Sequence, residues 1–239
     1  MDRPTRGVAV KVFGEYACFS RPEFKVERVS YAVMTPSAAR GVLEAIFWKP
    51  EFRYEIREIH VLKLGSQTTV LRNEISDRQG VRPIVVEQKR QQRTSLVLKD
   101  VAYVIRAEMV LRPHAAQEIG SYLDQFNRRL EPGQCHHTPC LGTREFSAFF
   151  EPSGTEDRGD VGNGELTLDL GQMLFEIAYV EARDGRKPEL EFWRATAEGR
   201  RKVGGYAVPL FFHAKLEQGV LGVRPEEYGR LYRLEDGNA

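Results

Sequence analysis

The sequence predicts an α+β protein, with a ferredoxin-like N-terminal domain that carries a long basic insertion and a small antiparallel β-domain after it. Up to residue 150, the patterns follow the order strand, helix, strand, strand, helix, strand, which is the ferredoxin-like order. A polar, glycine-rich run at residues 152–165 then precedes a second set of short apolar segments. We therefore expect domains at residues 1–150 and 151–239.

Composition excludes several classes of protein. The chain has 239 residues and 41% hydrophobic residues, enough for a substantial core. A net charge of +1 argues against a uniformly basic nucleic-acid binder but allows a local basic patch. Three cysteines give no disulfide framework. No apolar run suits a signal peptide or a membrane span, so we expect a cytoplasmic protein without membrane contact.

The first strand and the first helix have clear local signals. Residues 7–13 predict a short first strand, because they are rich in β-branched side chains. Thr35 can cap a helix that starts with Pro36, and Pro50 prevents its continuation. Gly41 costs about 1 kcal/mol against alanine inside this helix, so we expect a close approach at that point.

The later elements follow from apolar spacing. Residues 52–64 alternate with a one-residue slip after Ile56, which predicts a long strand with a bulge or a strand end buried on both faces. Residues 101–112 form a strong strand, and residues 119–130 an amphipathic helix. Residues 135–150 are rich in turns and run into another strand.

Residues 71–99 differ from their surroundings. They have few apolar anchors, and we expect a long, mobile, basic insertion, with a solvated polar loop as the alternative. Its cations are Arg72, Arg78, Arg82, Lys89, Arg90, Arg93 and Lys99. At the other end of the chain, the segment from Leu221 is charged, and we expect it to be frayed.

Familiar catalytic signatures are absent from the sequence. Cys135–Cys140 offers four ligands within six residues, too close together to surround one tetrahedral zinc ion. There is no P-loop, nucleophile elbow or HExxH motif. We predict neither a metal site nor a cofactor.

Metal-independent RNA cleavage would leave almost no linear signature. It needs only proton transfer and charge stabilisation, which His, Tyr, Lys and Arg can supply. Phe47 and Trp48 could stack bases, while Arg40 and Lys49 could hold phosphates. The alternative for both aromatic residues is core packing at the end of the helix.

Four segments together resemble the subtype-d Cas five protein family of type I-C CRISPR systems. They are GEYACFSRPEFKVERVSYAVMTPSAARGVLEAIFWKP at residues 14–50, RNE at 72–74, RQQR at 90–93 and PCLGTREF at 139–146. The resemblance implies a metal-independent endoribonuclease that cuts the repeat stem-loops of CRISPR precursor RNA. It also implies that the protein stays on the 5′ handle and joins the other subunits of the surveillance complex.

The resemblance also implies candidate catalytic positions. Family members place Tyr or His where this chain has Phe47, and a Lys-His pair where it has Ser121 and Tyr122. Tyr122 could still transfer a proton, although it lies on the apolar stripe of its helix, where a buried core tyrosine is equally expected. The alternative set is Tyr31, His136 or His137, acting with an arginine. The candidate RNA contacts are Arg21, Lys25, Arg28, Arg40, Trp48, Lys49, Arg72, Arg90, Arg93 and Arg144.

Three functional hypotheses follow. The first is the CRISPR precursor endoribonuclease, and the second is a non-cleaving subunit that binds the handle of the mature RNA. The third is general duplex binding, including duplex DNA, through the basic insertion.

Overall fold

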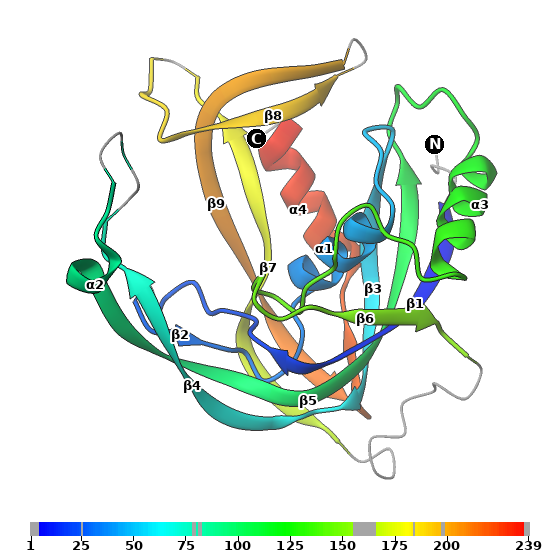
Figure 1. Ribbon diagram of the computed structural model, residues 1–239. Helices are drawn as coiled ribbons and strands as arrows, with labels where there is room; N and C mark the ends of the chain where they lie inside the picture. The colour runs from blue at the N-terminus through cyan, green and yellow to red at the C-terminus, as the bar shows by residue number, and fades with distance from the viewer. Residues whose placement is uncertain are drawn as a thin grey trace.

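The computed structural model describes residues 5–24, 26–77, 80, 83–154, 166–183, 185–196 and 199–236. The candidate RNA contact Lys25 therefore lies outside the described residues, as do Arg78 and Arg82 of the insertion. The chain is a mixed α/β protein whose sheet is mostly antiparallel, as predicted (Figure 1).

Four strands and two helices of the first half come in the predicted order. The four strands are β1 (Thr5–Ala17), β3 (Phe52–Lys63), β5 (Arg90–Leu111) and β6 (Phe149–Pro152). They lie side by side in the order β6-β1-β5-β3, and every neighbouring pair is antiparallel. Helices α1 (Pro36–Ile46) and α3 (Ile119–Leu130) pack against this sheet (Figure 1). The register of β3 shifts between Ile56 and Glu58, which confirms the predicted bulge.

Helix α1 begins as its sequence predicts. The Thr35 hydroxyl accepts a hydrogen bond from the Ala38 amide at 3.3 Å, and Pro36 is the first helical residue. The expectation about Gly41 is wrong. Gly41 is exposed, and a Cβ added there would meet nothing within 4 Å.

We therefore expect Gly41→Ala to stabilise the protein by about 0.5–1 kcal/mol, because alanine loses less backbone entropy in a helix. Chemical denaturation measures the change. Gly142→Ala is the contrasting control, since Gly142 has a φ of +89° and its Cβ would lie 2.0 Å from the Cys18 carbonyl oxygen. A Gly41→Ala protein that is less stable than the wild type would contradict this prediction, because it would mean that position 41 does not tolerate a Cβ.

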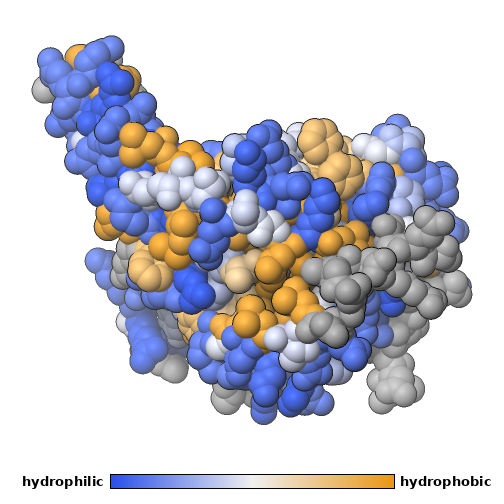
Figure 2. Space-filling model, turned by 90° about the horizontal axis from the view of Figure 1, so that it is seen from below, coloured by the Kyte–Doolittle hydropathy of each residue, from blue (hydrophilic) through white to orange (hydrophobic). Residues whose placement is uncertain are grey.

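Over its described residues the basic insertion folds as an arm of paired strands, so the expectation of a loop is wrong there. Strand β4 (Ser66–Ile75) pairs antiparallel with the first ten residues of β5, from Arg90 to Lys99, and α2 (Val86–Lys89) lies at the tip. The short strand β2 (Arg28–Val29) adds a parallel pairing to β5. The arm forms because this ladder satisfies its backbone groups without needing many apolar anchors. Figure 2 shows it projecting from the body, largely hydrophilic with some hydrophobic atoms near its tip.

The second half continues the same sheet. Its strands are β7 (Leu168–Glu181), β8 (Leu190–Thr196), β9 (Gly199–Glu217) and β10 (Val220–Gly222). Strand β10 pairs with both β3 and β9, so the ten strands form one sheet.

The segment after Leu221 is not frayed over its described residues. It forms β10 and then helix α4 (Pro225–Asp236), which packs against β7. Tyr228 and Leu231 of this helix are buried, and their burial is the reason that a charged segment is ordered.

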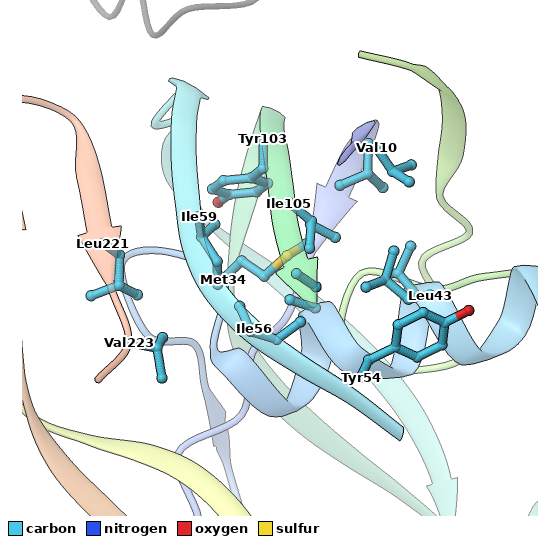
Figure 3. Packing of buried hydrophobic residues seen from close by; sticks show 14 of the residues in the cluster. Val10, Met34, Leu43, Tyr54, Ile56, Ile59, Tyr103, Ile105, Leu221 and Val223 are labelled. Carbon is cyan, nitrogen blue, oxygen red and sulfur yellow. The ribbon is translucent and has the colours of Figure 1, made fainter. Parts of the chain in front are cut away.

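The core lies between the sheet and the helices. Figure 3 shows Leu43 of α1 beside Val10 and Tyr54, with Met34 between Ile59 and Ile105. On the described part of the chain, no helix is long and apolar enough to cross a membrane.

Candidate nucleic-acid interface

Two half-buried side chains follow the end of helix α1. Phe47 adopts an extended conformation with φ −154°, which ends the helix, and its amide still donates to the Leu43 carbonyl at 3.0 Å. The Phe47 ring is 2% exposed and stacks on Phe52 at 5.5 Å between centroids. Because Phe47 fills the core, the half-buried Trp48 and Lys49 lie at the surface that follows it.

Three distant segments meet at this helix end. Arg129 of α3 donates to the Ile46 carbonyl at 3.3 Å, and its guanidinium carbon lies 5.4 Å from the centre of the Phe47 ring. The backbone amides of His136 and His137 donate to the Ala45 carbonyl at 2.8 and 3.3 Å. These donors satisfy carbonyl groups that a helix end leaves unpaired.

The third segment is β9. The guanidinium carbon of Arg200 lies 5.0 Å from the centre of the Trp48 ring, a cation–π contact. We call the six residues gathered here the α1 exit cluster: Trp48, Lys49, Arg129, His136, His137 and Arg200. Both histidine side chains are exposed, and their ring centres lie 5.8 Å apart. The cluster thus combines two groups able to transfer protons with three cations and an aromatic ring.

Tyr122 lies beneath the cluster. It is 1% exposed, packs on Phe52 at 5.4 Å and has the Lys49 ammonium nitrogen 6.0 Å from its ring centre. Burial, reinforced by the charge of Glu51, raises the pKa of the Tyr122 hydroxyl. Ser121 is exposed on α3, and its carbonyl accepts a hydrogen bond from Gln125 at 3.2 Å. Burial favours the interpretation of Tyr122 as a core residue.

Tyr31 has contacts on other segments. It is 1% exposed, and its hydroxyl accepts a hydrogen bond from the Leu174 amide of β7 at 3.1 Å. The Arg21 guanidinium carbon lies 4.5 Å from the Tyr31 ring centre. Burial raises the pKa of the Tyr31 hydroxyl. These contacts fit a residue that packs β7 against the first half.

Arg40 binds carboxylates of the protein itself. Its Nε and Nη2 atoms donate to the two carboxylate oxygens of Glu176 at 2.7 and 2.9 Å, and Nη1 donates to Glu44 at 2.7 Å. The attraction of Glu176 outweighs burial and holds the pKa of Arg40 well above its usual value. Because Glu176 is on β7, this pair joins α1 to the second half of the sheet.

Two candidate RNA contacts are similarly paired near the arm. Arg28 binds Glu145 at 2.8 Å, and Arg72 binds Glu74 at 2.8 Å and the Ser95 hydroxyl at 2.7 Å. These carboxylates compete with a phosphate for both guanidinium groups.

Three further candidates lie on the arm or beside Glu145. Arg90 is exposed at the start of β5, Arg93 of the same arm donates to Gln91 at 2.8 Å, and Arg144 is exposed. The predicted RNA contacts therefore do not share one area. Some lie at the α1 exit cluster, some on the arm and some near Glu145, while Arg40 is held by Glu176 and Arg21 lies over the Tyr31 ring.

Comparison with known proteins assigns the chain to a family. The family model Cas_Cas5d, described as CRISPR-associated protein (Cas_Cas5), matches residues 7–224. The chain belongs to the Cas5d family. It is 63% identical over 230 residues to the CRISPR pre-crRNA endoribonuclease Cas5d of Thermus thermophilus, covering 96% of each chain.

A second Cas5d relative is more distant. The chain is 38% identical over 237 residues to the CRISPR pre-crRNA endoribonuclease Cas5d of Mannheimia succiniciproducens, covering 91% of this chain and 95% of the relative. A crystal structure of a CRISPR-associated protein shares the fold, with a TM-score of 0.63 and 22% identity over 94% of this chain and 95% of that one.

Sequence reasoning missed Arg129 and Arg200 of this Cas5d chain. Arg129 belongs to a basic pair in the last turn of α3, and Arg200 begins a run of three cations on β9. Those two basic runs are visible in the sequence. The positions of Arg129 and Arg200 beside α1, however, depend on contacts between segments far apart in the sequence. Among the described residues, no group of three or more His, Cys, Asp or Glu side chains is placed to hold a metal ion.

Proposed function

We propose that this Cas5d chain is a CRISPR pre-crRNA endoribonuclease that cleaves the repeat hairpin, acts in the cytoplasm and remains on the 5′ handle within the type I-C surveillance complex. The observation that carries this proposal is the 63% identity, over 96% of each chain, to a protein named for that activity. The α1 exit cluster supplies a surface with suitable chemistry.

The cluster suits attack by a 2′-hydroxyl on its own phosphodiester. One group must remove the 2′-hydroxyl proton, and another must protonate the departing 5′-oxygen. His137 and His136 are exposed imidazoles held by their backbone amides at the helix end. Lys49, Arg129 and Arg200 bring positive charge to the same surface, where it would stabilise the phosphorane and would not require a metal ion.

We infer that residues 1–150 are a ferredoxin-like domain and that residues 151–239 form a β-rich second domain. The support for the first is the antiparallel strand order β6-β1-β5-β3, with α1 and α3 as the two helical connections. The support for the second is the set of strands β7, β8 and β9, which pair among themselves.

Cleavage of a cognate repeat hairpin in EDTA tests the activity. We expect a product ending in a 2′,3′-cyclic phosphate, because the attacking oxygen belongs to the substrate. A hairpin with a single 2′-deoxy substitution at the scissile nucleotide is the matched control and should remain intact. Loss of cleavage in EDTA that magnesium restores would contradict metal-independent attack by the 2′-hydroxyl.

The non-cleaving subunit is the second candidate function. It is favoured by Phe47, which has no proton to transfer, and by Tyr122, which is 1% exposed. This function predicts tight binding of the hairpin without any cut under the same conditions. The third, general duplex binding through the arm, predicts affinity that falls steeply with salt and depends little on sequence.

A further inference from the structure

The hairpin of β8 and β9 presents a tryptophan to solvent. Trp193 is 63% exposed, an unusual exposure for so large an apolar ring. It pairs across the hairpin with Lys202, and Ala195 pairs with Arg200. Because directly paired residues of antiparallel strands point to the same face, Trp193, Lys202 and Arg200 share one face of this hairpin.

This face continues into the α1 exit cluster. Arg200 contacts Trp48, and Lys202 follows two residues later on β9, about 7 Å further along the strand. Figure 1 shows the β8–β9 hairpin reaching across toward the segment that follows α1. Aromatic rings and cations therefore alternate from Trp48 through Arg200 to Trp193 and Lys202.

The chemistry of this row of aromatic rings and cations matches unpaired nucleotides. An exposed indole offers a flat face on which any base can stack, and adjacent cations hold the phosphates. Bases within a stem are already stacked on one another, so they would gain little from Trp193. Lys202 contacts Glu191 at 2.5 Å, but both side chains are more than half exposed, so that pair is weak and a phosphate can compete for the ammonium group.

We propose that the β8–β9 hairpin binds single-stranded nucleotides that flank the stem of the repeat RNA, with a base stacked on Trp193 and a phosphate beside Lys202. This inference rests on the proposed function and extends the α1 exit cluster into the second half of the protein. Trp193 is a binding residue in this arrangement and takes no part in the proton transfers.

Two RNAs test the proposal: the repeat hairpin with its single-stranded flanks and the same hairpin trimmed to its stem-loop. Trp193→Ala should weaken binding of the flanked RNA at least about 5-fold and leave binding of the trimmed RNA unchanged, as expected for one lost stacking contact. Trp193→Phe should retain most of the affinity. Phe149→Ala is the matched control, because Phe149 is 65% exposed on β6 and should leave both affinities unchanged.

The other outcomes separate this inference from the proposed function. If Trp193→Ala binds both RNAs like the wild type, the exposed tryptophan serves another partner, such as a protein subunit, and the inference alone fails. If Trp193→Ala weakens binding of both RNAs equally, the contact is with the stem, and the inference is overturned as well. If the wild-type protein binds neither RNA, the proposed function fails together with it. Thermal denaturation of each variant verifies that the fold is intact.

Discussion

Replacing Arg40 with methionine should lower the free energy of unfolding by about 3 kcal/mol, because removing one partner of a buried ion pair leaves the other charge uncompensated. Glu176 is 1% exposed, and both of its carboxylate oxygens accept hydrogen bonds from Arg40. Methionine retains much of the bulk of the side chain, so the change acts mainly on the charge. Denaturant titration measures the loss.

Two further variants make the stability experiment specific. Arg40→Met combined with Glu176→Gln should recover much of the loss, because no buried charge remains. Arg106→Met is the matched control: Arg106 is 43% exposed and lies 3.8 Å from Glu58, so its removal should cost less than about 1 kcal/mol. If folded Arg40→Met instead kept full stability and lost affinity for RNA, the guanidinium would be a phosphate contact.

His137→Ala should reduce the rate of RNA cleavage by about 10²–10⁴-fold while RNA affinity changes little, as expected when a general acid or base is removed. His137 is exposed at the α1 exit cluster, and its backbone is held by the Ala45 carbonyl. Tyr122→Phe should cleave within about 2-fold of the wild type, because its hydroxyl is buried and burial raises its pKa. Single-turnover cleavage and equilibrium binding, measured side by side, give both quantities.

Two other histidines provide the comparisons for this experiment. His213→Ala on β9 removes an exposed imidazole that pairs with Asp169 of β7 at 3.0 Å, and this variant should cleave normally. His136→Ala measures how much the neighbouring imidazole contributes to the cleavage rate. The assignment to His137 would be wrong if His137→Ala cleaved at the wild-type rate. If Tyr122→Phe were inactive and still stable, proton transfer would belong to Tyr122.

The parts of the fold that could be predicted from sequence are those with local signals. The Thr35 cap, the proline that begins α1 and the slip after Ile56 each involve residues close together in the chain, and the structure contains all three features. The arm was missed because its ladder joins β4 to β5 through hydrogen bonds, which leave little apolar pattern. The order of α4 was missed because its charged surface hides the buried Tyr228.

The candidate site shows the same division. Trp48 and Lys49 could be found from sequence because they directly follow a helix end that the sequence marks clearly. Arg200 lies about 150 residues further along the chain, and only the pairing of β10 with β3 and β9 brings its strand into the same sheet. A residue type without a neighbouring motif gives no indication of which distant ring it will contact.

Tyr228 of α4 is translated much later than β3, the strand that it contacts. Strand β10 covers β3 only from Glu58 to His60, and the amide of Ile56, beyond that cover, donates to the Tyr228 hydroxyl at 2.6 Å. On the ribosome, β3 therefore emerges long before Tyr228, the residue that accepts the hydrogen bond from the Ile56 amide at the edge of β3. Until α4 is translated, that edge must be occupied by water or by a chaperone, and the nascent first half is prone to aggregate during that interval.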